Sequence, residues 1–161
     1  MSSRRALLDP TAIDEHALTL QRLTRPVKHA DGVHDLLLSL GDLSRAEITV
    51  RLADPSSANA WLTDLVRARR IFEAHIGGEP RYVAIEDAGK LRDALGVVPP
   101  RGTPKAFLER GADPMADLVA RYARTHVPFP LSDVVARFGA SRASVEIAVR
   151  GLLTRGKLEE G

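Results

Sequence analysis

Cysteine is absent from the 161 residues, and aromatic side chains make up only 4% of them. The lack of cysteine excludes disulfides, thiolate zinc sites and cysteine nucleophiles together. Because aromatic residues are scarce, any core must be built mainly from Leu, Val, Ile and Ala. Hydrophobic residues nevertheless reach 44%, a normal value for globular proteins. We therefore expect a folded chain.

The sequence also lacks a long apolar run and a strong excess of charge. No uninterrupted apolar stretch approaches the roughly 20 residues that span a bilayer, and the apolar residues 6–8 are too few for a signal peptide. We expect a cytoplasmic protein with no membrane partner. Net charge is only +2 although the pI is about 9.3, which permits a nucleic-acid partner without requiring one. Whether the chain binds nucleic acid must therefore be judged from where its basic residues lie.

One pattern of elements occurs twice: a helix, a turn, two further helices and then strand residues. In the cleaner copy, residues 113–160, four residues form one apolar helical face: Met115, Leu118, Val119 and Tyr122. Ser132 can cap a short second helix, and Ser141 can cap a third. The third helix directs four residues inward: Val145, Ala148, Val149 and Leu152. Residues 157–161 would form the first strand of a wing.

The first copy opens near Asp31, a possible cap, and its first helix closes at Gly41. Ser44 and Glu47 have the spacing of a capping box at the start of a short second helix. The third helix follows residues 55–57, and four residues are expected on its buried side: Trp61, Leu62, Leu65 and Val66. This order of helices matches that of the second copy.

The residues after these helices are typical of a β-hairpin. Residues 72–76 alternate in polarity, Gly77 and Gly78 supply a turn, and residues 82–85 return. Residues 86–95 then favour another helix. Helix–turn–helix followed by a hairpin is how a winged helix is built, and that module usually contacts nucleic acid.

The sequence therefore predicts a mainly α fold with short β-hairpin wings, organised as tandem winged-helix domains. Residues 1–29 would hold an N-terminal linker helix, and residues 30–96 the first winged helix. The Pro- and Gly-rich residues 97–112 would link it to a second winged helix at residues 113–161, whose wing is truncated. Because the chain stops within that wing, we expect it to be part of something longer.

Two stretches resemble segments of large helicase-related (Lhr-type) ATP-dependent DNA helicases. They are residues 33–41, Val-His-Asp-Leu-Leu-Leu-Ser-Leu-Gly, and residues 120–129, Ala-Arg-Tyr-Ala-Arg-Thr-His-Val-Pro-Phe. The resemblance continues, in order, through Trp61 and the short motifs at residues 93–96, 136–139 and 156–160. It covers roughly residues 30–161.

The resemblance implies a fragment from the region C-terminal to the helicase core of a superfamily 2 (DEAD/DEAH-type) enzyme that acts in DNA repair. It implies ATP and Mg²⁺ for the parent core, and DNA, single-stranded or forked, together with other domains of the parent helicase as partners. Some long members of this group are associated with base excision by their C-terminal region.

The chain itself carries no motif for that chemistry. The Gly-x-x-x-x-Gly-Lys-Ser/Thr loop that cradles phosphates is absent, as is any Asp-Glu-x-His/Asp box. The Gln-x-Gln arrangement of related glycosylases has no counterpart, because Gln21 is the only glutamine. We expect no catalytic residue and no cofactor in this chain, and so an accessory part without activity of its own.

The third helix of a winged helix usually enters the major groove, so its outward residues are the candidates for DNA contact. In the second copy, six residues on this helix and the segment after it are candidates: Ser141, Arg142, Ser144, Arg150, Arg155 and Lys157. In the first copy five residues of the third helix and wing are candidates: Asn59, Arg67, Arg69, Arg70 and Arg81. Both sets have a plainer interpretation, in which the serine is only a cap and the arginines are solvated.

Two further features have competing interpretations. Trp61 could stack on an unpaired base, but its spacing from neighbouring leucines favours the core. The group Asp31, His34 and Asp35 has helical spacing, but without another His or Cys nearby we expect a cap and a solvated face, not a metal site. For the whole chain the alternatives are a protein-interaction or inter-domain packing module and a winged-helix transcription regulator.

Overall fold

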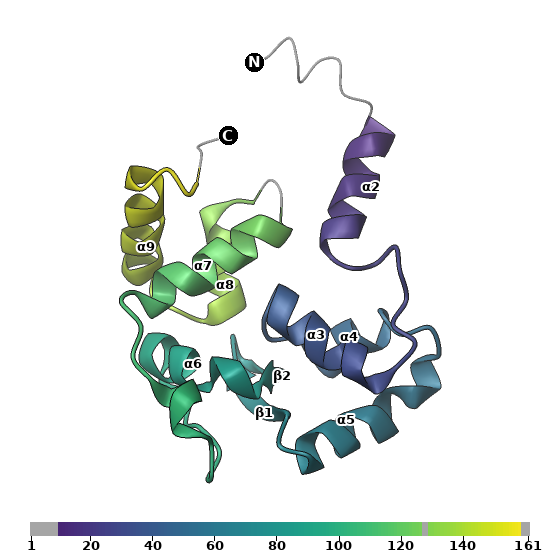
Figure 1. Ribbon diagram of the computed structural model, residues 1–161. Coiled ribbons are helices and arrows are strands. Elements are labelled where there is room, and N and C mark those ends of the chain that lie inside the picture. The colour runs from purple at the N-terminus through teal and green to yellow at the C-terminus, as the bar shows by residue number, and fades with distance from the viewer. Residues whose placement is uncertain (1–9, 127–128, 159–161) are drawn as a thin grey trace.

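A computed structural model describes residues 10–126 and 129–158, and the side chains from residue 15 onward. The helices are α2 (Pro10–Leu20), α3 (Ala30–Leu40), α4 (Arg45–Thr49), α5 (Ala58–Arg67), α6 (Ala88–Leu95), α7 (Pro114–Thr125), α8 (Leu131–Phe138) and α9 (Arg142–Thr154). Strands β1 (Ile71–Ile76) and β2 (Glu79–Ala84) and the 3₁₀ turns η1 (Pro55–Ser57), η2 (Ile85–Asp87) and η3 (Lys105–Leu108) complete the described chain. The predicted fold class, mainly helical with a β-hairpin wing, is confirmed (Figure 1).

The first three-helix unit comprises α3, α4 and α5. The capping box is confirmed, because the Glu47 N–H donates to Ser44 Oγ at 3.2 Å and the Ser44 N–H donates to Glu47 Oε1 at 2.9 Å. Asp31, however, is not the cap of α3: His29 holds that position and Asp31 lies in the first turn. Val66 is also misassigned, since α5 leaves it 41% exposed while Leu62 and Leu65 are buried.

The hairpin contributes side chains to two hydrophobic cores, one on each of its faces. β1 and β2 pair antiparallel with Ile71 opposite Ala84 and Phe72 opposite Val83. Side chains alternate between the two faces of a strand, so Ile71 and Ala84 join the core of α3, α4 and α5, while Phe72 and Val83 join that of α6 to α9. In Figure 1 the hairpin accordingly lies between these two groups of helices.

A third backbone segment extends this small sheet. The Leu43 N–H donates to the Tyr82 carbonyl at 3.1 Å, and the Tyr82 N–H donates to the Leu43 carbonyl at 2.7 Å. The bridge holds the turn after α3 against the edge of β2. It also brings Asp42 beside Arg81, the neighbours in sequence of the two bridged residues.

The second unit consists of α7, α8 and α9. Asp113 caps α7 through its carboxylate, and Ser141 caps α9 by accepting from the Ser144 N–H at 3.1 Å, as predicted for Ser141. Ser132 is not the cap of α8, because Pro130 occupies that position and Ser132 lies within the helix.

The two copies do not both form complete winged helices. One winged helix is evident, made by α3, α4, α5 and the hairpin, whereas residues 113–126 and 129–158 contain three helices and no strand. The expected strand at residues 157–161 lies mostly outside the described residues, and Lys157 and Leu158 are not part of a strand. The division into domains at residues 97–112 stays a prediction.

The turn of the hairpin packs against the turn between α8 and α9. Gly77 adopts a φ of +63°, and a Cβ there would lie 2.5 Å from the Arg137 carbonyl oxygen and 2.9 Å from that of Ala136. On the other side, a Cβ on Gly139 would lie 3.1 Å from the Cα of Gly77. Glycine is therefore required at the tip for steric reasons, and the wing is joined to the second unit.

A pair of substitutions tests this close approach. Gly77→Ala and Gly78→Ala both place a side chain at positive φ, but a Cβ on Gly78 meets nothing within 4 Å. We expect Gly77→Ala to lower the free energy of unfolding by about 1–3 kcal/mol more than Gly78→Ala, because only the first also forces the units apart. Urea denaturation of both variants measures the difference, and equal losses would contradict the docked turn.

Candidate nucleic-acid interface

Helix α9 has one buried face and one basic, solvent-facing side. Val145, Ala148 and Leu152 are buried in the core, which fixes the rotation of the helix about its axis. The residues predicted to contact DNA from this helix and its end are all exposed: Ser141, Arg142, Ser144, Arg150, Arg155 and Lys157. The structure thus brings this whole set to one helix and the turn after it.

The polar groups at the start of α9 already have partners within the chain. Ser141 Oγ donates to Ser144 Oγ at 2.8 Å, and Arg142 Nε donates to Glu146 Oε1 at 3.0 Å, one turn further along the helix. An exposed ion pair of this kind contributes little to stability, so the guanidinium can exchange a carboxylate for a phosphate at low cost. Arg150 and Arg155 form no ion pair within residues 15–126 and 129–158, which leaves their guanidinium groups in solvent.

The arginines at the end of α5 do not form one open cluster. Arg67 and Asn59 are exposed, but Arg69 takes a left-handed φ of +60° and donates to the Arg101 carbonyl at 3.0 Å. Arg70 turns back toward α3, where it donates to Asp31 at 2.5 Å and to His34 at 3.1 Å. The chain reverses direction here, so three arginines that are close in sequence point to three different places.

Arg81 is a clear departure from expectation, since only 4% of it is exposed. Its guanidinium donates to Asp42 Oδ2 at 2.9 Å, to Glu79 Oε1 at 2.9 Å and to the Arg137 carbonyl. A buried guanidinium with its hydrogen bonds satisfied has no capacity left for a phosphate. Arg81 is therefore removed from the set of candidate DNA contacts.

Arg137 on α8 is a residue that the sequence did not single out. It donates to both carboxylate oxygens of Glu47, at 2.8 and 3.0 Å, and to the Asp42 carbonyl at 2.5 Å. Arg81, Asp42, Arg137 and Glu47 together form what we call the hairpin ion network, which joins the two units. No local pattern could reveal it, because its members come from four separate segments.

The network changes the acidity of Glu47. Burial alone would raise the pKa of this carboxyl, but hydrogen bonds from Arg137 and from the Ser44 backbone outweigh burial and lower the pKa to about 2. Glu47 therefore has two roles: it completes the capping box of α4 and accepts the bidentate contact from the second unit. A carboxylate that accepts a guanidinium in this way is well oriented as well as charged.

Trp61, predicted in the core, and His34, predicted on a solvated face, have different surroundings from those predicted. Trp61 packs only partly buried against the core of the first unit. His34 contacts Glu86 at 2.9 Å through its Nε2 and accepts from Arg70 through its Nδ1. Both ring nitrogens are thus occupied by protein partners.

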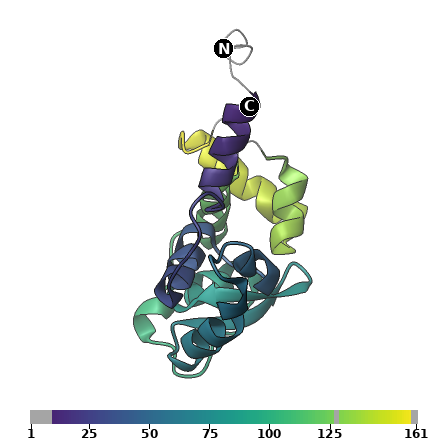
Figure 2. The same ribbon diagram turned by 90° about the vertical axis from the view of Figure 1, so that its right-hand side faces the viewer.

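The two candidate helices do not share a surface. In Figure 1, α9 lies at the upper left of the molecule and α5 at the lower right, with the hairpin between them. Figure 2 also shows α9 near one end of the molecule and the hairpin toward the other.

Comparison with known families identifies the chain. The model of the large helicase-related protein winged-helix domain matches residues 6–110, which include α3, α4, α5 and the hairpin. The chain belongs to the large helicase-related (Lhr) family. Within the described residues, no helix is both long and apolar enough to cross a membrane.

Two curated relatives extend the similarity through the second unit. The chain is 42% identical over 160 residues to the Lhr helicase/probable uracil glycosylase of Mycolicibacterium smegmatis. The aligned region covers 95% of this chain and 11% of that protein. It is 36% identical over 153 residues to the Lhr helicase/uracil glycosylase of Escherichia coli, covering 93% of this chain and 10% of that protein. The chain thus spans about a tenth of the length of the Lhr proteins it matches. The matching family model describes a winged-helix domain and no catalytic one.

The titration of Glu47 gives a test of the hairpin ion network. Because its pKa falls from 4.5 to about 2 on folding, the ion pair stabilises fully above about pH 4.5, and this stabilisation disappears as the pH falls toward 2. Glu47→Gln removes the charge and keeps an acceptor for the capping box. We expect the variant to be less stable by about 1–2 kcal/mol near neutral pH, after allowance for solvent screening.

Urea unfolding across the acidic range measures this difference. The gap in unfolding free energy between the two proteins should close as the pH falls from 4.5 to about 2. A gap that stays constant over that range would show that the stability of the ion pair does not depend on the Glu47 charge.

Proposed function

We propose that the chain is a non-catalytic DNA-binding part of an Lhr-type helicase and that α9 is its main contact. The observation that carries this proposal is the exposed basic side of α9, whose opposite face is fixed in the core. Helix orientation and charge distribution agree here, because the buried residues leave Arg142, Arg150 and Arg155 in solvent.

The chemistry of these side chains suits a nucleic-acid backbone. Guanidinium groups donate two parallel hydrogen bonds to a phosphate, and they remain charged at any physiological pH. Ser144 adds a hydroxyl near the start of the helix, where the backbone N–H groups and helix dipole favour an anion. Arg155 and Lys157 follow the last turn and would contact phosphates beside the site where the helix enters the groove.

The helicase relatives suggest how such a contact is used. Their names join a helicase to a uracil glycosylase. We infer that a helicase core elsewhere in the parent protein hydrolyses ATP with Mg²⁺ and that this chain supplies grip on single-stranded or forked DNA during repair.

One observation favours a packing role as a second candidate. Ile147 lies on α9 between the basic residues and is 68% exposed, and an apolar side chain in that position suits a protein surface as well as a thymine methyl group. The hairpin turn already packs against the second unit, so these modules do form interfaces with one another. In this case the basic side of α9 would face another domain of the parent helicase.

A binding series with the whole chain separates the two functions. The double change Arg150→Ala and Arg155→Ala should weaken binding to duplex and forked DNA about tenfold. It should also reduce the slope of log affinity against log salt by about 0.9 for each phosphate that the variant no longer neutralises. Fluorescence anisotropy at several salt concentrations measures both quantities.

Two controls place the contact. Arg110→Ala removes one exposed charge outside the helical units and should leave affinity unchanged. Arg67→Ala removes an exposed charge on α5, and a weaker affinity confined to this variant would assign DNA binding to the first unit. If the chain binds none of the DNAs, the packing role replaces the proposed one.

A further inference from the structure

The loop between α2 and α3, residues 21–29, is the most basic short stretch outside the helices already considered. It carries Arg22, Arg25, Lys28 and His29 and no acidic residue. All four side chains are exposed. The chain as a whole has nearly balanced charge, with 23 Lys and Arg residues and 21 acidic residues, so this loop is a local concentration of positive charge. Neither α9 nor α5 contributes to this surface.

Both ends of the loop are held by hydrogen bonds. The Val27 N–H donates to the Arg51 carbonyl at 2.8 Å, and the Ala53 N–H donates to the Val27 carbonyl at 2.8 Å. Arg51 also donates from Nε to the Gln21 carbonyl at 2.8 Å. The backbone is thus fixed at Gln21 and Val27, while the basic side chains between and beyond these points extend into solvent.

Packing beneath the loop is as close as its hydrogen bonding. A Cβ on Gly32 would lie 2.6 Å from Val27 Cγ1, so the first turn of α3 presses directly against the loop. This packing positions Lys28 and His29 beside the start of α3. The backbone that carries the cations is therefore held in place before any ligand arrives, which lowers the entropic cost of binding.

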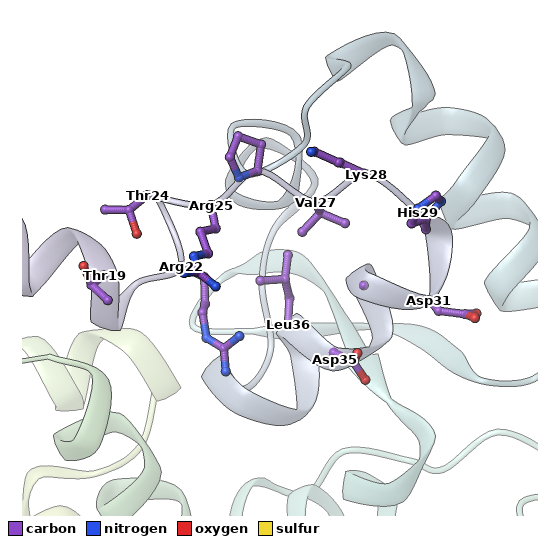
Figure 3. Close-up of a pocket in the computed structure, with 12 residues that line it drawn as sticks. Thr19, Arg22, Thr24, Arg25, Val27, Lys28, His29, Asp31, Asp35 and Leu36 are labelled. Carbon is purple, nitrogen blue, oxygen red and sulfur yellow. The ribbon is translucent and has the colours of Figure 1, made fainter.

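These residues surround a hollow of about 700 Å³, shown in Figure 3. Its lining includes the four basic residues and two hydroxyl groups, those of Thr19 and Thr24. Two carboxylates, Asp31 and Asp35, also line it, but Asp31 accepts an ion pair from Arg70. The cations therefore outnumber the one carboxylate that remains.

Arg22 adopts an unusual backbone conformation for its residue type. Its φ is +59°, in the region where glycine is the favoured residue, and it follows the last turn of α2. The Leu23 N–H donates to the Leu18 carbonyl at 2.9 Å, which makes this a helix end that glycine would normally form. An arginine is conformationally unfavourable here, and such a residue is a candidate for a functional role of its side chain.

We propose that this loop is a second nucleic-acid contact, which binds the phosphate backbone of a single strand through Arg22, Arg25 and Lys28. This inference rests on the proposed function, from which it takes nucleic acid as the class of ligand, and it adds a binding site separate from α9. Successive phosphates of a strand match several cations spread along residues 22–28, and the hollow leaves room for sugars and bases. In Figure 1 the loop lies on the right of the molecule and α9 on the left, so the two sites can be removed independently.

Arg22→Gly is the most informative single change. Glycine relieves the positive φ while it removes the cation and its hydrogen bond to Ser39 Oγ, at 3.1 Å. We expect the melting temperature to stay level or rise and the affinity for single-stranded DNA to fall about threefold to tenfold. A variant that loses stability and keeps its affinity would show that Arg22 is structural, and would overturn the proposal.

A second variant tests directly whether the positive charges of the loop contribute to binding. Arg25→Gln with Lys28→Gln keeps two polar side chains and should lower the salt slope for single-stranded DNA by about 0.7 for each phosphate that is no longer neutralised. Inorganic phosphate and ATP serve as competitors in the millimolar range. If either displaces the strand at the loop as well as unlabelled DNA does, the site takes isolated phosphates and the strand assignment is wrong.

Comparison with the α9 variant distinguishes the two proposals. Loss of affinity in both variants supports both sites. If the α9 variant alone is weakened, the loop proposal fails and the proposed function stands. If the loop variants alone are weakened, the loop proposal stands and the assignment to α9 fails. If the unaltered chain binds no nucleic acid, even where it binds an acidic polypeptide such as polyglutamate, both are overturned.

Discussion

The arrangement of the two helical units depends on the hairpin ion network. Arg81 and Asp42 are both almost completely buried, and Arg137 reaches from α8 to the carboxylate that caps α4. Burying charges is costly, so such a network is weak evidence for stability on its own. Its directional hydrogen bonds nevertheless fix which surfaces meet. Removing Arg81 or Asp42, the fully buried pair, would leave the other charge unpaired inside the protein at a cost of about 3–5 kcal/mol.

This constraint decides which basic residues remain available for nucleic acid. A wing commonly lies beside DNA, but this hairpin has cores on both faces and its turn packs against the α8–α9 turn. The arginines nearest to it, Arg81 and Arg137, are therefore structural. Exposed basic residues remain on the outer side of α9 and on the loop between α2 and α3, and the two proposed sites lie there.

Much of the fold follows from local patterns in the sequence. The capping box at Ser44, the cap at Ser141 and the Gly-Gly turn were predictable because each signal involves neighbouring residues only. Residue type favours Asp31 and Ser132 as the caps of α3 and α8, but both residues lie inside their helices. Both helices instead begin after a residue with no side-chain cap hydrogen bond, and composition alone cannot signal such a start.

In the candidate site, too, only the features that depend on local sequence could be predicted. The exposure of Arg142 and Arg150 could be predicted, because helical periodicity fixes which side of α9 is buried. The burial of Arg81 could not, since its carboxylate partner lies 39 residues earlier in the chain. The strand predicted at residues 157–161 lies mostly outside the described residues, and Lys157 and Leu158, which are described, are not part of a strand.

Equilibrium unfolding followed by two probes tests most directly whether the hairpin makes the two units one cooperative structure. Trp61 is the only tryptophan and packs against the core of the first unit, so its fluorescence reports on that unit. Far-ultraviolet circular dichroism reports on the helices of both units. We expect coincident urea transitions by the two probes. A tryptophan transition clearly separated from the loss of helix would show that the units unfold independently, and would contradict this expectation.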